Sequence, residues 1–166
     1  MLELVIGGVL FACFAYTGTG IRAYYRRRKE LFEQYVGFLE YLKENIGFLR
    51  SPLAECTIEY CRGKKGEFIK ILNEYAKMLE EGRMGREDFE KLFSSPYIDK
   101  ERKRELCAVF YGLGKVDEDT QIDNLRKARA AAEAPLEFYR KKYATTGTLA
   151  FRLGVVFGIA AMILAA

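Results

Sequence analysis

The chain has 166 residues, of which 50% are hydrophobic and 30% are charged, with 27 basic and 23 acidic side chains. This length allows one folded domain, and so apolar a composition excludes a chain that is mostly disordered. The formal net charge of +4 is too small by itself to indicate nucleic-acid binding.

The charged residues are distributed unevenly along the chain. Glu3 is the only charged residue before Arg22, and Arg152 is the only charged residue after Lys142. The two ends are therefore apolar and the middle is highly charged, which is typical of a soluble domain between two membrane-spanning segments.

The first apolar segment predicts a transmembrane helix over residues 1–21. At 1.5 Å per residue, its roughly 20 apolar residues cross the hydrocarbon layer of about 30 Å. A cleaved signal peptide is the alternative. Such a peptide begins with basic residues, whereas here Glu3 precedes the apolar run and the basic residues follow it.

The last segment predicts a second transmembrane helix over residues 144–166. Its uninterrupted apolar part starts only at Leu153, so the helix must begin near Ala144 to be long enough. Arg152 would then lie about 12 Å inside the span unless its side chain extends toward the headgroups. The alternative is a segment that lies on the membrane surface or is buried against a partner.

Basic residues flank the middle domain on both sides. Five of them lie between Arg22 and Lys29, and three more form the run from Arg140 to Lys142. Because Lys and Arg near a span are retained in the cytoplasm, residues 22–143 are predicted to be cytoplasmic and both termini extracytoplasmic. We interpret the basic runs as attracted to anionic lipid rather than to nucleic acid.

Between the spans, apolar residues recur at helical spacing, and no window shows the alternation of a strand. The first helix continues through Leu31, Tyr35, Phe38, Leu42, Ile46 and Leu49. Three further helices are expected at Ser51 to Tyr60, Phe68 to Leu79 and Arg86 to Phe93, the first with Ser51 as N-cap and Pro52 in its first turn. Asp99 is expected to cap another helix, which carries Leu106, Val109 and Phe110. The last helix is expected to begin between Asp117 and Asp119 and to kink at Pro135; its apolar residues are Ile122, Leu125, Ala132, Leu136 and Tyr139. Breaks are expected at Gly63 to Gly66, Gly82, Ser94 to Pro96, and Gly112 with Gly114. The sequence therefore predicts an all-α fold, a cytoplasmic bundle of about six helices flanked by N- and C-terminal transmembrane helices.

The sequence offers little for catalysis. It has no histidine, which excludes a Ser-His-Asp triad, a Cys-His pair and histidine metal ligands. The four cysteines, Cys13, Cys56, Cys61 and Cys107, lack CxxC spacing, and we interpret them as small apolar residues. The stretch GLGK at Gly112 to Lys115 lacks the first glycine and the Ser or Thr of a phosphate-binding loop. We expect no catalytic, cofactor or metal site.

Two other features carry information. Gly154 with Gly158, and Gly8 with Ala12, are small residues spaced by four, which lets transmembrane helices approach closely. The turn from Gly112 to Gln121 is either a simple helix connection with an acidic N-cap or a contact surface for a partner.

Several segments of the chain occur in a distinctive order and spacing. These are the first span with its basic residues, SPLAE at Ser51 to Glu55, LGKVDEDTQ at Leu113 to Gln121, the long charged helix, and the last, glycine-containing span. In this arrangement the chain resembles the stage III sporulation protein AB family of endospore-forming bacteria. The resemblance implies a non-enzymatic component of the channel complex between mother cell and forespore, located in the mother-cell membrane. It also implies a cytoplasmic part similar to the helical domain of the inner-membrane platform proteins of type II secretion and type IV pilus machines.

The expected partners follow from the same resemblance. They are the membrane, a stage III AA-type ATPase that the protein couples to the membrane assembly, and other stage III channel components; nucleic acid is not expected, and a homo-oligomer stays possible. The expected partner-binding residues are Leu53, Glu55, Lys115, Asp117 and Gln121. The alternatives are a membrane-anchored helical sensor or ligand-binding module, and a small membrane enzyme whose catalysts are carboxylates.

Overall fold

The computed structural model describes the backbone of residues 2–46 and 52–164, and the side chains of residues 5–45 and 52–164. It divides into two compact units. The helix-pair unit contains Met1–Lys29 and Glu137–Ala166, and the bundle unit contains Glu30–Leu136. The expected domain limit after residue 21 lies within α1 (Leu2–Ile46), and the one after residue 143 lies in a π-helical turn (Tyr143–Gly147), both inside the helix-pair unit.

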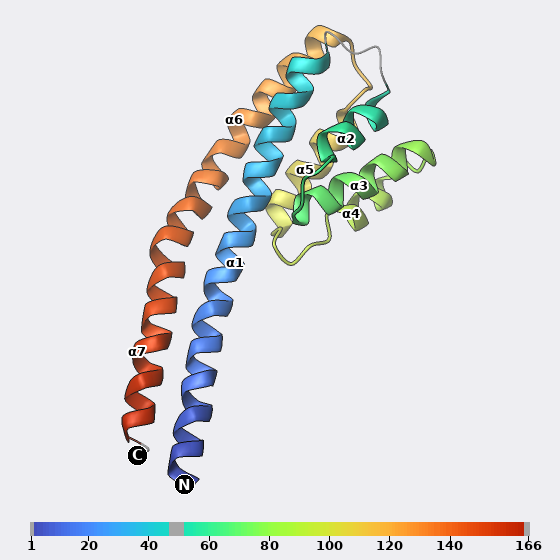
Figure 1. Ribbon diagram of the computed structural model, residues 1–166. Helices are drawn as coiled ribbons and strands as arrows, with labels where there is room; N and C mark the ends of the chain where they lie inside the picture. The colour runs from blue at the N-terminus through green and yellow to red at the C-terminus, as the bar shows by residue number, and fades with distance from the viewer. Residues whose placement is uncertain (1, 47–51, 165–166) are drawn as a thin grey trace. The chain divides into compact units, whose positions relative to one another are not determined.

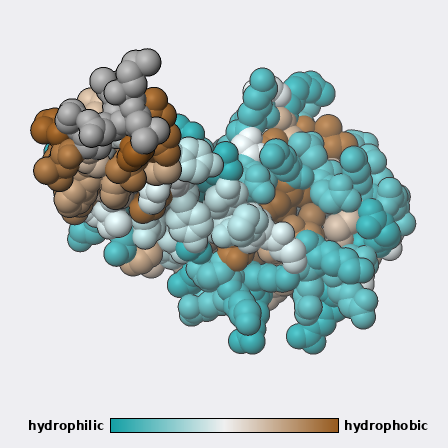
Figure 2. Space-filling view, turned by 90° about the horizontal axis from the view of Figure 1, so that it is seen from below, coloured by the Kyte–Doolittle hydropathy of each residue, from teal (hydrophilic) through white to brown (hydrophobic). Residues whose placement is uncertain are grey.

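The described residues form helices and no strand, which confirms the all-α prediction (Figure 1). In chain order the elements are α1 (Leu2–Ile46), α2 (Leu53–Cys61), α3 (Glu67–Glu80), α4 (Arg86–Leu92), α5 (Lys100–Gly112), α6 (Glu118–Lys142), a π-helical turn (Tyr143–Gly147) and α7 (Thr148–Leu164). Two stretches, Val5–Asn45 and Glu118–Leu164, are long and apolar enough to cross a membrane. In Figure 2 apolar surface gathers over the ends of the paired helices, whereas the bundle is mostly hydrophilic.

The expected helix limits agree with the structure to within a few residues, because they rest on local signals. Asp99 caps α5, and its carboxylate accepts a hydrogen bond of 3.0 Å from the backbone N–H of Arg102. The chain leaves α5 through Gly114, whose φ of 74° favours glycine. Ser51, the expected N-cap of α2, lies outside the described residues, and Pro52 takes the N-cap position.

The last expected helix differs in one respect. It continues through Pro135, and regular α geometry is interrupted later, by the π turn that separates α6 from α7. A π turn adds one residue to a helix, so it changes the face on which all later residues lie. This change cannot be read from the apolar pattern on one side of the turn alone.

The core of the bundle unit is aromatic and centred on Phe110 of α5, which is fully buried. The centroid of its ring lies 4.9 Å from that of Tyr75, 5.0 Å from Phe93 and 5.9 Å from Phe38. These rings come from α3, the segment after α4, and α1, so one side chain ties four segments together. Leu31, Tyr35, Phe38 and Leu42 of the expected apolar face are buried; the side chains of Ile46 and Leu49 lie outside the described residues.

Candidate functional site

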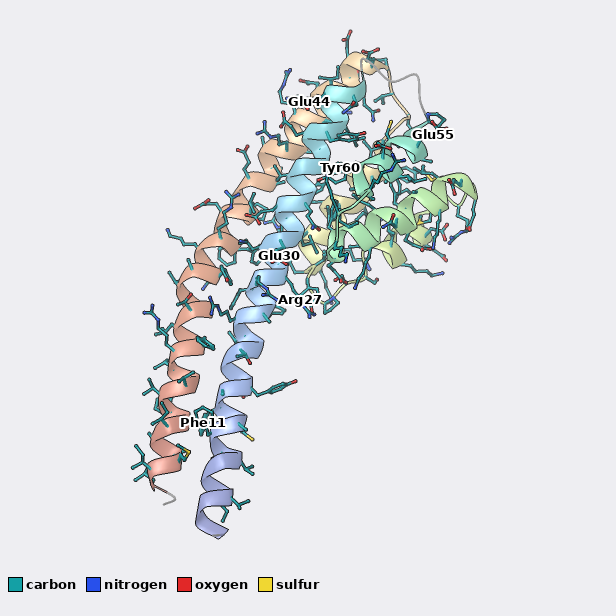
Figure 3. The ribbon with its side chains drawn as sticks, in the orientation of Figure 1. Phe11, Arg27, Glu30, Glu44, Glu55 and Tyr60 are labelled. Atoms are coloured by element: carbon teal, nitrogen blue, oxygen red, sulfur yellow. The ribbon has the colours of Figure 1, made fainter. Side chains whose placement is uncertain are left out.

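Helices α1 and α7 of the helix-pair unit approach closely at two buried glycines. A Cβ atom added to Gly154 would lie 2.7 Å from the carbonyl oxygen of Phe14 and 3.3 Å from the Cα of Gly18. A Cβ added to Gly158 would lie 3.3 Å from the Cα of Phe11, a residue of α1 whose side chain lies between the two helices in Figure 3. The backbones are therefore so close that only glycine fits without movement.

On α1, the residue at this contact is Gly18. A Cβ on Gly18 would lie 2.7 Å from the carbonyl oxygen of Ala150, whereas a Cβ on Gly8 would have no atom within 4 Å, and Ala12 is exposed. Gly18 was not predicted as a packing residue, because the residues four positions before and after it are Phe14 and Arg22. It therefore belongs to no pair of small residues spaced by four. The only signal for Gly18 was a glycine inside an apolar run.

The turn between α5 and α6 is held by two of the expected partner-binding residues. The carboxylate of Asp117 accepts a 3.0 Å hydrogen bond from the backbone N–H of Thr120, and this hydrogen bond lowers the pKa of Asp117 below its ordinary value. The side-chain oxygen of Gln121 accepts a 3.0 Å hydrogen bond from the backbone N–H of Gly114, and Gln121 is buried. Asp117 therefore caps α6, and Gln121 closes the turn in front of it.

The other three expected residues are placed differently. Lys115 is exposed, and its ammonium lies 3.1 Å from the centroid of the Tyr111 ring. Leu53 and Glu55 lie in the first turn of α2, where Leu53 is half-buried and Glu55 is exposed (Figure 3). The structure thus brings Lys115, Asp117 and Gln121 together in one turn, and Leu53 and Glu55 in another element.

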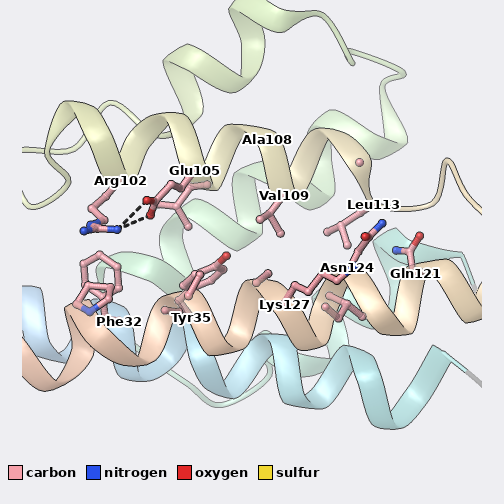
Figure 4. Close-up of a pocket in the computed structure, with 17 residues that line it drawn as sticks. Phe32, Tyr35, Arg102, Glu105, Ala108, Val109, Leu113, Gln121, Asn124 and Lys127 are labelled. Carbon is pink, nitrogen blue, oxygen red and sulfur yellow. Dashed lines mark hydrogen bonds and ion pairs between the residues drawn. The ribbon is translucent and has the colours of Figure 1, made fainter.

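A groove of about 450 Å³, which we call the apolar groove, lies between α5 and α6 and is floored partly by α1 (Figure 4). Small and apolar side chains line most of it, namely Ala108, Val109, Leu113, Ala128, Ala131 and Ala132. One end holds the ion pair between Arg102 and Glu105, 2.7 Å apart, and the other end holds Gln121 and Asn124. Burial raises the pKa of Tyr35 on the floor well above its usual range, and the charge of Glu105 adds to this effect.

A second groove, of about 590 Å³, lies between α4 and α5. Its polar lining consists of four cations and one carboxylate, Arg86, Lys100, Lys103, Arg104 and Glu90. Its apolar lining consists of Phe89, Cys107, Ala108 and Tyr111. We call it the basic groove. The ammonium of Lys115 lies over the ring of Tyr111, which lines this groove, so the turn after α5 places a fifth cation next to it.

The basic groove was not predicted from the sequence, because two acidic residues, Glu101 and Glu105, stand among the basic residues of this stretch. The helical period separates them: Lys100, Lys103 and Arg104 share one face of α5, whereas Glu105 lies on the other, where it lines the apolar groove. The i, i+3, i+4 spacing of these three basic residues indicated that they share one helix face. Whether that face is exposed depended on which face of α5 the core covers.

The cysteines show no arrangement typical of a metal or nucleophilic site. Cys56 and Cys61 are buried and Cys107 is half-buried, and in each case burial raises the pKa of the thiol. The Cys107 thiol donates a 3.4 Å hydrogen bond to the carbonyl oxygen of Phe89. Within the described residues, 5–45 and 52–164, no group of three or more Cys, Asp or Glu residues is placed to hold a metal ion.

Comparison with known proteins gives one match. Searches against curated proteins and against solved structures matched nothing. Residues 3–165 match the family described as stage III sporulation protein AB, so the match covers both apolar helices and the whole bundle. The chain therefore belongs to the stage III sporulation protein AB family, which gives it a role in sporulation.

Proposed function

We propose that this protein is a non-enzymatic scaffold of the sporulation channel complex between mother cell and forespore, and that it couples a cytoplasmic ATPase of the stage III AA type to the membrane assembly. The observation that carries the proposal is the continuity of α1, which is helical from Leu2 to Ile46 and thus belongs to both an apolar helix pair and a folded bundle. A continuous helix resists bending better than a flexible linker, so it suits transmission of a movement.

The distribution of charge supports a cytoplasmic position for the bundle. The basic runs on α1 and α6 lie next to the apolar segments, at the ends that connect to the bundle. With this orientation the bundle and the ATPase occupy the same compartment. The helical fold is also compatible with the platform-like role that the family resemblance implies.

We assign the ATPase contact to the basic groove and the adjoining turn. Four cations face one carboxylate in this groove, and the pair that Glu90 forms with Arg86 is exposed, with 3.7 Å between the atoms. An acidic segment with apolar side chains complements such a lining, because its charges steer association and Cys107 and Tyr111 supply apolar contact. Lys115 at the rim extends the basic surface, and Glu55 with Leu53 offers a separate acidic and apolar contact on α2 for another channel component.

A binding experiment tests the proposal. The full chain in lipid nanodiscs is mixed with the purified stage III AA-type ATPase of the same organism, and affinity is measured at low and physiological salt. We expect binding that weakens at least tenfold in the double variant Lys103→Glu, Arg104→Glu. The matched control is Lys70→Glu, Lys77→Glu on α3, where both lysines are exposed.

The outcomes separate two claims. If the ATPase does not bind the wild-type chain, the coupling function is wrong. If it binds the wild type and the Lys103, Arg104 variant equally, the function stands and the basic groove is not the contact. Spore yield from the same variants shows whether the contact matters in cells.

The apolar groove favours a second candidate, a membrane-anchored ligand-binding module. Its volume of about 450 Å³ and its apolar walls with polar ends are typical of a small-molecule site. In that case a ligand should raise the unfolding temperature of the wild-type chain. Ala128→Phe, which fills the groove, should remove that increase.

A further inference from the structure

In the helix-pair unit, two cations of α1 lie at one aromatic ring from a distant part of the chain, the ring of Tyr143. The guanidinium carbon of Arg22 lies 5.7 Å from the centroid of the Tyr143 ring, and the ammonium of Lys29 lies 5.2 Å from it. Arg22 also lies 5.2 Å from the ring of Phe151. Arg22 and Lys29 are two turns apart on the same face of α1, so the electron-rich face of one ring attracts both.

A neighbouring set repeats the arrangement. The guanidinium of Arg28 lies 4.4 Å from the Tyr139 ring and 5.5 Å from the Tyr24 ring, and it donates a 3.0 Å hydrogen bond to the Tyr24 hydroxyl. The ammonium of Lys142 lies 5.6 Å from the Phe138 ring. Tyrosines beside the end of an apolar segment are typical of the headgroup layer of a membrane.

The π turn is what places Tyr143 against α1. The 19 residues from Tyr139 to Gly158 would advance about 100° beyond five full turns in a straight α-helix. The extra residue of the π turn removes about the same angle, so these two buried residues lie on one face. The face that carries Tyr139 at one end therefore still points at α1 where the glycines begin.

The backbone of this turn is stabilised locally. The hydroxyl of Thr145 donates a 2.7 Å hydrogen bond to the Lys141 carbonyl, and that of Thr148 donates one of 3.4 Å to the Tyr143 carbonyl. A Cβ added to Gly147 would lie 3.5 Å from the Cα of Arg22, so the two backbones are close here. The site is therefore held by side chains, a π turn and a close backbone approach.

The charge around this site is strongly one-sided. Residues 22–29 and 137–143 together hold eight basic side chains and one acidic side chain, Glu137. Among the described residues, Arg22, Lys141 and Lys142 have no carboxylate within 4.0 Å. A phosphate group supplies the missing negative charge and accepts several hydrogen bonds from a guanidinium.

We propose that Arg22, Lys29 and Tyr143 form the centre of a binding site for the phosphate of an anionic membrane phospholipid. The ligand is a lipid because the site lies where the apolar segments end, and the exposed apolar side chains of α7 lie beside it for the acyl chains. The site is distinct from the basic groove, which belongs to the bundle unit.

Lipid retention by the full chain tests the proposal. The detergent-solubilised protein is incubated with phosphatidylglycerol or phosphatidylcholine of identical acyl chains, and bound lipid is counted by native mass spectrometry. We expect preferential retention of phosphatidylglycerol. Neutralising one cation should weaken this preference about fivefold, and Arg22→Gln, Lys29→Gln together about 30-fold. The control pair Lys70→Gln, Lys77→Gln on α3 should keep it.

Two further measurements protect the test against misfolding. Tyr143→Phe keeps the ring and should retain most of the preference, whereas Tyr143→Leu should lose it at unchanged helicity. In the unmodified protein, raising the salt concentration from 50 to 500 mM should reduce retention of phosphatidylglycerol but not of phosphatidylcholine.

Several results would overturn the proposal. They are equal retention of both lipids by the wild type, no effect of Arg22→Gln with Lys29→Gln, or an equal effect of the control pair. Displacement of the lipid by millimolar inorganic phosphate would show a site for soluble phosphate instead, and displacement by a short DNA duplex would show a nucleic-acid site.

Discussion

Replacing Gly154 with alanine tests the close approach of α1 and α7. The added Cβ would lie 2.7 Å from the carbonyl oxygen of Phe14 and 3.3 Å from the Cα of Gly18. Both atoms belong to the backbone, so no side-chain rotation relieves the contact. Ordinary van der Waals contact begins at 3.4 Å, so the helices must separate locally by about 0.7 Å, the difference between 2.7 and 3.4 Å.

The cost of this separation follows from packing. A gap of about 0.5–1 Å removes a quarter to a half of the attraction of each atom pair across the contact, and extra methyl groups in packed sites cost about 1–3 kcal/mol. Alanine recovers up to about 1 kcal/mol through its better helix propensity. We therefore expect Gly154→Ala to destabilise helix pairing by about 1–2 kcal/mol. Gly18→Ala, whose Cβ would lie 2.7 Å from the Ala150 carbonyl oxygen, should cost as much.

Pulsed EPR in micelles measures the effect. Spin labels at the exposed positions Leu10 and Met162 report the distance between the helices while SDS is titrated into the sample. The matched controls are Gly8→Ala and Gly20→Ala on α1, because a Cβ at either position would have no atom within 4 Å. Both controls should separate at the wild-type SDS concentration and Gly154→Ala at a lower one. If Gly154→Ala separates together with the controls, the helices do not pair through this glycine.

Three further predictions concern the bundle. Gln121→Ala leaves the backbone N–H of Gly114 without its acceptor and should lower the free energy of unfolding, measured in urea, by about 1–3 kcal/mol. Lys115→Glu should leave this free energy near the wild-type value. Equal urea midpoints for the two variants would contradict the role of Gln121 in closing the turn. The pKa of Asp117 is lowered in the folded protein, so its contribution to stability is present above the ordinary aspartate pKa and lost as pH falls through the folded value. Asp117→Asn should flatten that part of the stability curve against pH, and an unchanged curve would refute the cap. A cysteine label at Gly63 should be protected in intact cells and a reporter fused to the C-terminus should be active outside the cytoplasm; labelling from outside would reverse the orientation.

The sequence alone was sufficient for features that depend on neighbours within one helical turn. The N-cap at Asp99 forms a hydrogen bond to a residue three positions later, and the cap at Asp117 does the same. The two apolar segments needed only length and composition. The buried face of α1 through Tyr35 and Phe38 followed from the helical period, because one face of a long amphipathic helix has to be covered.

The tertiary structure decided what depends on residues far apart in the chain. Gly18 matters only because Ala150 comes within reach of it, and the spacing of small residues on α1 pointed instead to Gly8. The basic groove exists because the core covers the other face of α5, which leaves Lys103 and Arg104 beside α4. Each of these features is a matter of helical phase between packed elements. The π turn rotates the whole segment after it once, by about 100° about the helix axis. The periodic pattern of one helix does not tell where its partner requires such a rotation.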